Sequence, residues 1–343
     1  MNTKDKIFVS ILLVLTVVGG LSKEVRGSEE LFNLVPDKAI IVAYIDANKQ
    51  DPGLSYQLRL WKDKLDRRGE YRKREQIKEI YDRLGHVEAV GAIFIDQKGT
   101  LQHIVIVKIV GKNDDKEGQF NIFQEDIKRL IKKKEELRAL SYLEYKIIYS
   151  VDRYPSEVSA YVCIDDDIIA VGTNAEVLKE IIRVKKRRVD SLAGDKKFID
   201  MKSRFAKGSD GFIYIDNKDG RFIKLLREWE QKHYMTLLLS GDFLEAIGIF
   251  FDIVDEDISK GRIVLFTHQE NALFDDIQDD TRFFDEVIRR KFMAEGVKYT
   301  SEITINSQYA ILDFKITGLE PFWTKVFGEE RKEIIKGNEN NIK

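Results

Sequence analysis

Three consecutive carboxylates, Asp165, Asp166 and Asp167, stand between two apolar runs in "CIDDDIIAV" at residues 163–171. Adjacent carboxylates can bind a divalent cation, because hard cations prefer oxygen ligands. Aspartates also favour a tight turn, since they tolerate left-handed backbone angles and hydrogen-bond their own backbone. The matching hairpin of the second half has Asn-Ser-Gln at 306–308, which keeps the turn chemistry without the charge. We therefore interpret the three aspartates as a turn between two strands.

A second acidic segment, "FDIVDEDISKGR" at residues 251–262, matches a calcium-binding EF-hand loop only in part. Counted from Asp255, the loop has Asp257 and Ser259 at positions three and five. Its twelfth position is Phe266, where such a loop needs a bidentate glutamate. We interpret this segment as a hairpin tip in solvent.

The side chains that perform most enzyme chemistry are scattered along the chain. No histidine forms a His-Glu-x-x-His motif or a metal-binding pair four residues apart, and Cys163 lies in an apolar strand pattern typical of an inert core thiol. The sequence has no phosphate-binding glycine loop, no Gly-x-Ser-x-Gly and no Ser-x-x-Lys. We assign no catalytic, cofactor-binding or metal-binding residue, and we expect no cofactor. The four histidines are His86, His103, His233 and His268.

The composition excludes two broad classes of protein. With 43% hydrophobic and 34% charged residues, the 343-residue chain is too hydrophobic to be disordered. Its formal net charge of −2 provides no overall field that would attract nucleic acid. A single cysteine cannot form an intrachain disulfide and leaves the redox compartment open.

The amino-terminal residues resemble an export signal. Two lysines within the first six residues precede an uncharged apolar run at 7–21, and polar residues follow. Val25 and Gly27 fit the small-residue positions of a cleavage site. The run is shorter than the roughly 20 residues that span a bilayer comfortably, so a cleaved signal and a short anchor in the inner membrane are both open. We predict that residues 1–27 export the protein to the periplasmic or extracellular face.

Charge is distributed unevenly after this segment. Residues 56–85 hold ten Lys or Arg against six acids, "RVKKRR" at 183–188 is a second basic cluster, and residues 251–286 are acidic. A basic face could contact anionic lipid, glycan or an acidic partner. The alternative, which we favour, is ordinary solvated helix faces, because acids are interspersed in the longer basic segment. Nucleic acid is disfavoured as a partner.

Two blocks of sequence recur in the two halves of the chain. "VAYIDANK" at 42–49 resembles "FIYIDNKD" at 212–219, and "VEAVGAIFID" at 87–96 resembles "LEAIGIFFDI" at 244–253. A further strand pattern, a helix, a hairpin and another helix follow in each copy. Aligning the Glu-Ala-x-Gly steps puts Ala89 and Ala246 at matching positions, where we expect a helix to pack closely on the sheet and a larger side chain to be equally costly.

This order of elements predicts an α+β fold of two pseudo-repeated lobes, each a mainly antiparallel sheet with packed helices. The first lobe would span 28–205 and the second 206–330, with a polar tail at 331–343. Among the helices we expect are 56–85, 123–140 and 279–296. A groove between the lobes is the default binding site.

Three stretches resemble the bacterial domain-of-unknown-function family thirty-three fifty-two. They are "LFNLVPDKAIIVAYID", "IDDDIIAVGTNAEVLKEII" and "SLAGDKKFIDMKSRF", and "GSDGFIYID" continues the last of them. The resemblance covers about residues 31–320. The resemblance implies an extracytoplasmic, often membrane-tethered protein, and it implies no established activity or catalytic residue.

These observations favour an exported envelope protein that is a non-enzymatic binding or scaffold module. Its partner would be an envelope protein, a glycan or a lipid. The alternative is an extracytoplasmic hydrolase whose carboxylates meet only in three dimensions. A polar pocket with converging acids would favour the hydrolase, and a shallow apolar groove would favour binding.

Overall fold

The computed structural model describes one antiparallel sheet and the helices that cover it. The residues described are 29–48, 86–95, 100–110, 116–131, 137–150, 159–205, 211–225, 227, 244–253, 258–267, 278–279, 281–282, 285–286, 289–290, 297–306 and 309–318. The apolar run 7–21, the basic segment 56–85 and the tail 331–343 lie outside these residues, so the predictions made for them stay predictions.

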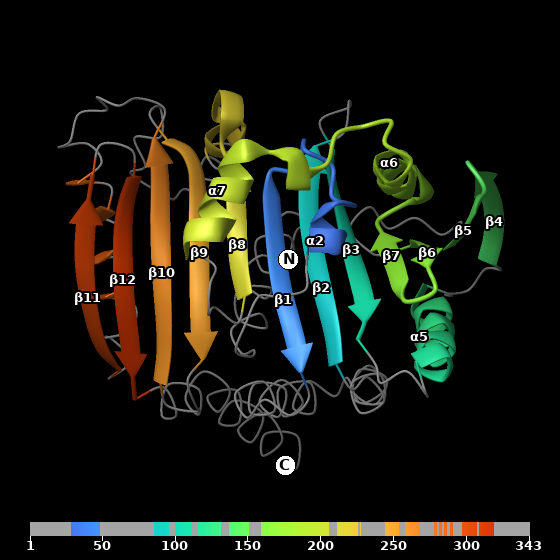
Figure 1. Ribbon diagram of the computed structural model, residues 1–343, viewed down its shortest axis with the longest axis horizontal. Coiled ribbons are helices and arrows are strands. Elements are labelled where there is room, and N and C mark those ends of the chain that lie inside the picture. The colour runs from blue at the N-terminus through green and yellow to red at the C-terminus, as the bar shows by residue number, and fades with distance from the viewer. Residues whose placement is uncertain are drawn as a thin grey trace, which may run out of the picture.

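The strands form a single twelve-stranded sheet in the order β11-β12-β10-β9-β8-β1-β2-β3-β7-β6-β5-β4 (Figure 1). Every neighbouring pair is antiparallel. The expected α+β class with a mainly antiparallel sheet is therefore confirmed. The strands are β1 (Ile41–Asn48), β2 (His86–Ile95), β3 (Leu101–Ile109), β4 (Leu137–Tyr142), β5 (Tyr145–Ser150), β6 (Ala160–Asp165), β7 (Ile168–Gly172), β8 (Gly211–Asp216), β9 (Leu244–Ile253), β10 (Ile258–Thr267), β11 (Lys298–Ile305) and β12 (Tyr309–Thr317).

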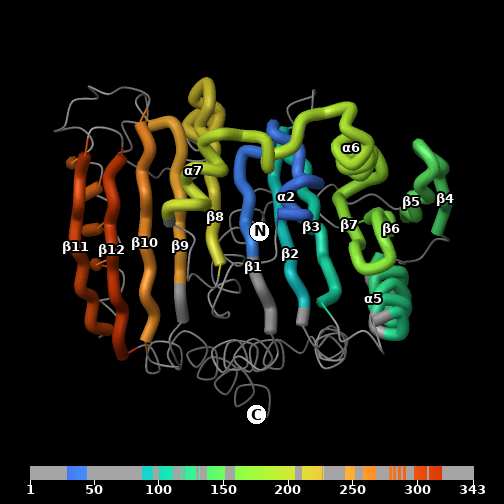
Figure 2. The backbone as a smooth tube through the Cα atoms, in the orientation of Figure 1, coloured from blue at the N-terminus to red at the C-terminus, as the bar shows by residue number. Residues whose placement is uncertain are grey.

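The middle of the sheet is the pairing of β1 with β8, which joins the two halves of the chain. Five residue pairs connect these strands, with Ala43 opposite Ile213 at their centre. Where we expected a groove between two lobes, the structure has a continuous hydrogen-bonded ladder. On one side the order runs β1-β2-β3-β7-β6-β5-β4, and on the other it runs β8-β9-β10-β12-β11, as the tube in Figure 2 shows.

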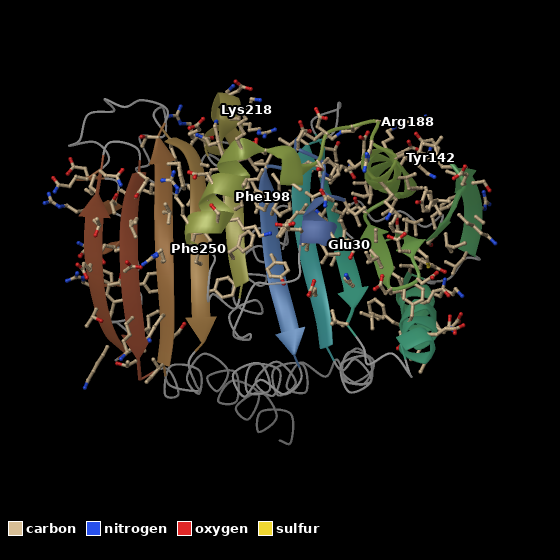
Figure 3. The ribbon with its side chains drawn as sticks, viewed as in Figure 1. Glu30, Tyr142, Arg188, Phe198, Lys218 and Phe250 are labelled. Carbon is tan, nitrogen blue, oxygen red and sulfur yellow. The ribbon has the colours of Figure 1, made fainter. Side chains whose placement is uncertain are left out.

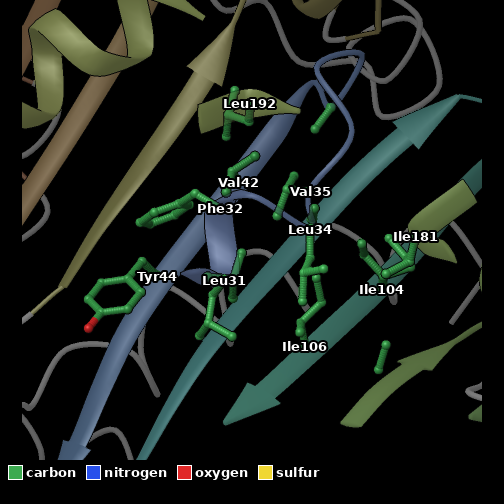
Figure 4. Close-up of a cluster of buried hydrophobic side chains, with 14 of the residues drawn as sticks. Leu31, Phe32, Leu34, Val35, Val42, Tyr44, Ile104, Ile106, Ile181 and Leu192 are labelled. Atoms are coloured by element: carbon green, nitrogen blue, oxygen red, sulfur yellow. The ribbon is translucent and has the colours of Figure 1, made fainter. Parts of the chain in front are cut away.

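Helices α2 (Glu29–Phe32), α6 (Ala175–Lys185) and α7 (Lys196–Phe205) lie over one face of the sheet (Figure 1). Strand side chains alternate between faces, so Val42 and Tyr44 of β1 point into the core beneath these helices. Leu31 and Phe32 of α2 are completely buried in the same core (Figure 4). Burial of this face therefore fixes α2 at the centre of the sheet.

Helix α5 (Lys116–Ile131) belongs to a second core formed by the opposite side chains of the first half. Phe123 and Ile127 of this helix cluster with Tyr161 of β6 and Ile169 of β7. Neighbouring Ile168 belongs to the first core, as the alternation of a strand buried on both faces requires. The sheet is thus covered on both faces in this half.

The helix expected at 123–140 differs from the one observed. Helix α5 ends at Ile131, and β4 begins at Leu137 and pairs with β5 in a hairpin. The hairpin turn consists of Leu143 and Glu144, both at positive φ (45° and 74°). Turns of this kind usually contain Asn or Gly, so the sequence lacked the signal that predicts them. The described residues between 278 and 290 are helical, in agreement with the helix expected at 279–296.

The expected equivalence of Ala89 and Ala246 is wrong. Tyr44 lies opposite Val90, whereas Tyr214 lies opposite Gly248, so the two Glu-Ala-x-Gly steps differ by one residue in register. A shift of one residue moves every side chain to the other face of a sheet. Accordingly Ala246 is buried in the core beneath the helices, and Ala89 packs at the edge of the α5 core.

This register predicts opposite effects at the two matching glycines. A methyl group at Gly248 would collide with Met201 Sδ of α7 and lie 2.8 Å from the Phe250 ring, so we expect Gly248→Ala to destabilise the protein by about 1–3 kcal/mol. At Gly91 the nearest atom would be the Ile104 carbonyl oxygen at 3.9 Å, so Gly91→Ala should leave stability unchanged or raise it by about 0.5–1 kcal/mol. Urea unfolding of both variants measures the difference, and equal losses would contradict the register.

Candidate functional site

The aspartates of "CIDDDIIAV" form the turn that the sequence predicted. Asp165 ends β6, Asp166 and Asp167 make the turn, and β7 begins at Ile168. The Asp165 carboxylate accepts a hydrogen bond from Lys185 Nζ at 2.5 Å. The turn therefore also ties the hairpin to the last residue of α6.

Cys163 and His103 occupy strand positions. Cys163 is half-buried in β6, where its Sγ accepts a hydrogen bond from Gln124 Nε2 of α5 at 3.1 Å. Burial raises the pKa of this thiol above its usual value, which lowers its reactivity. His103 lies in β3, in the interior of the sheet, and its carbonyl accepts from the Thr173 amide. His233 and His268 lie outside the described residues.

No group of three or more His, Cys, Asp or Glu side chains is placed to hold a metal ion in the part of the chain that the structure describes. Asp255 and Asp257 of the partial EF-hand pattern fall outside that part. Ser259 of the same pattern lies in β10, paired with Ile253 of β9 and Ile316 of β12.

An open groove of about 650 Å³ lies between α2 and the turn that follows α6. Its walls come from residues far apart in the sequence, and both acidic and basic side chains line it. Figure 3 shows Glu30 over the middle of the sheet and Arg188 beside α6. Six of the lining residues are Glu30, Asn33, Lys185, Arg187, Asp190 and Ser191.

Backbone hydrogen bonds hold the two walls of this groove together. The Leu192 amide donates to the Val35 carbonyl at 2.8 Å, and the Asp37 amide donates to the Asp190 carbonyl at 3.1 Å. Pro36 and Ser191 form an isolated antiparallel bridge. Because these contacts involve the main chain, the groove is shaped before any ligand arrives.

Glu30 is fixed to the sheet by Lys108 of β3, whose ammonium group donates to the Glu30 carboxylate. Burial alone would lower the pKa of Lys108, but the hydrogen bond and charge of Glu30 outweigh it and raise the pKa. Asp167 and Glu88 add to this effect. Lys108 therefore stays charged at neutral pH and anchors one wall of the groove.

The other wall is the end of α6, which closes in a Schellman motif. The Arg188 amide donates to the Arg183 carbonyl and the Arg187 amide to the Val184 carbonyl, each at 2.8 Å. Arg187 has a φ of 55°, the left-handed conformation for which glycine is usual. The basic cluster 183–188 is evident in the sequence, but no residue type there predicts this conformation.

The charges of this turn are only partly neutralised. Lys185 pairs with Asp165, and Lys186 pairs with Glu144 of the β4–β5 turn at 2.6 Å. Arg187 and Arg188 are exposed, and no ion pair joins either to another residue within the described ranges. Two cationic side chains, of which Arg187 lines the groove, are thus exposed to solvent.

Among the described residues, no helix combines the length and apolar character needed to cross a bilayer. No family model, no curated protein and no solved structure matches the chain.

The turn geometry predicts that charge at 165–167 is dispensable. Replacing Asp165, Asp166 and Asp167 with Asn-Gly-Asn keeps a sequence suited to the turn. It removes one half-exposed ion pair and the minor attraction between Asp167 and Lys108, so we expect a loss of no more than about 1 kcal/mol. The measurement is thermal unfolding with and without calcium. A calcium-dependent rise in Tm that disappears in the variant would reveal a metal site at this turn.

Proposed function

We propose that the protein is an exported envelope protein that binds a partner or acts as a scaffold, without catalysis. The observation that supports binding most directly is the groove between α2 and the turn after α6. Its walls are preshaped by main-chain contacts, and its charged side chains are held in ion pairs or face solvent. Such a surface suits recognition of a polar partner, which would be an envelope protein, a glycan or a lipid.

The amino-terminal sequence supports the export part of the proposal. A basic start, an apolar run at 7–21 and a small-residue site near Gly27 are the features of a secretory signal or a short anchor. The resemblance to family thirty-three fifty-two points the same way and belongs to this proposal.

We also propose that the two halves are copies of one duplicated unit. Support comes from the strand order, which is the same on both sides of the β1–β8 pair for five strands. Tyr44 and Tyr214 are both completely buried beneath the helices, on strands that pair with each other. The β4–β5 hairpin at the end of one side would then be an insertion in the first copy.

Export is tested by a reporter fusion. A reporter joined after Gly27 should reach the periplasm or the outer face, because the basic and apolar segments precede that point. The same fusion with charged residues placed in the run 7–21 is the control and should stay in the cytoplasm. Cytoplasmic retention of the unmodified fusion would contradict the proposed location.

Binding at the groove is tested by photo-crosslinking in the native envelope. A crosslinker at Asn33, which is exposed in the groove, should capture a partner that the same group at exposed Lys260 on β10 does not. The charge reversal Asp190→Lys should weaken capture because Asp190 lines the groove. Equal capture at both positions, or none at Asn33, would contradict a binding role for this groove.

A further inference from the structure

We propose that the basic turn at the end of α6, residues 185–188, contacts the anionic headgroups of phospholipids. This inference rests on the proposed export of the protein to a membrane face. The ligand of the turn would be the phosphate group of a lipid.

Arg187 has a backbone conformation that favours glycine. At this position of a Schellman motif glycine has no steric penalty, whereas a side chain is disfavoured. The motif needs only the two backbone hydrogen bonds to Arg183 and Val184, so the arginine side chain adds nothing to it. The sequence therefore keeps a guanidinium group at a position where folding favours glycine.

Two of the four basic side chains in this turn form no ion pair with another described residue. Basic residues near the end of a helix often serve only to offset the helix dipole, and Arg183 and Lys185 in the last turn of α6 fill that role. Arg187 and Arg188 lie beyond the last helical residue, and both side chains are exposed.

 Arg187 and Arg188 take no part in the ion pairs of Lys185 and Lys186. Guanidinium groups of this kind suit phosphate, which they can bind in a bidentate manner.

The basic turn lies close to α2, which directly follows the amino-terminal segment. The turn and α2 line one groove, and α2 begins at Glu29. Residues 22–28 connect α2 to the apolar run 7–21, and a fully extended connection could span at most about 28 Å. If that run lies in a bilayer, the turn is held near its surface. A single short apolar segment combined with basic residues is a common two-part membrane attachment.

The test uses the full chain reconstituted in vesicles of phosphatidylcholine alone or mixed with phosphatidylglycerol. A fluorophore on Asp190→Cys, in a Cys163→Ala background, reports proximity to lipids that carry a headgroup quencher. We expect stronger quenching in the anionic vesicles, and we expect added salt to reverse it. A fluorophore on Glu302→Cys of β11, at the far edge of the sheet, is the positional control and should not respond to lipid charge.

The decisive variant is Arg187→Gly with Arg188→Ser. This double variant should lower the ratio of lipid-bound to unbound turn by about 30-fold in anionic vesicles. The Tm of the variant should stay equal to that of the parent or rise. The matched control, Lys298→Ser with Lys315→Ser, removes the same charge from exposed positions on β11 and β12 and should behave as the parent does.

Quenching that is equal in both kinds of vesicle, or unchanged by the arginine substitutions, would overturn the lipid contact. Capture of an acidic protein at the turn without any lipid response would overturn it in favour of that partner. Failure of the reporter fusion to leave the cytoplasm would contradict the proposed location alone, because quenching in vesicles does not depend on export.

Discussion

The packing of Phe32 against the junction of β1 and β8 is the contact on which the rest of the structure depends. Its ring centroid lies 5.6 Å from Tyr44 of β1, 5.6 Å from Phe212 of β8 and 4.9 Å from Phe198 of α7. Each such aromatic pair contributes about 0.5–1.5 kcal/mol beyond the burial of its area. One side chain therefore joins both halves of the sheet to two of the elements that cover it.

The same contact fixes the groove. Because Leu31 and Phe32 are buried, α2 is held at the centre of the sheet. Glu30, which directly precedes Leu31, is thereby placed to pair with Lys108. The chain then leaves α2 through Val35, which accepts from Leu192 after the basic turn. Packing in the core thus sets the distance between the two walls of the groove.

The sequence predicted the local features of the fold and missed those that depend on distant pairing. The β6–β7 hairpin and the helix after it were expected, and aspartates mark the hairpin turn. In the structure Asn174 caps this helix, α6, by accepting from the Val177 amide. The β4–β5 hairpin was missed because Leu143 and Glu144 occupy a turn that usually needs Asn or Gly. The faces of Ala89 and Ala246 were misassigned because residue identity was aligned without knowledge of strand register.

The groove could not be predicted for a related reason. Its walls come from α2 and from residues 184–191, and no local pattern relates these segments. The basic cluster 183–188 was visible in the sequence. Which of its cations form ion pairs depends on the fold, and so does the role of the cluster. The side chains of Arg187 and Arg188 are exposed, whereas the Phe32 cluster is buried and stabilises the centre of the sheet. Substitution of these arginines therefore changes the charge of the surface while the core that holds the fold is kept, so the proposed role of this surface can be tested separately from folding.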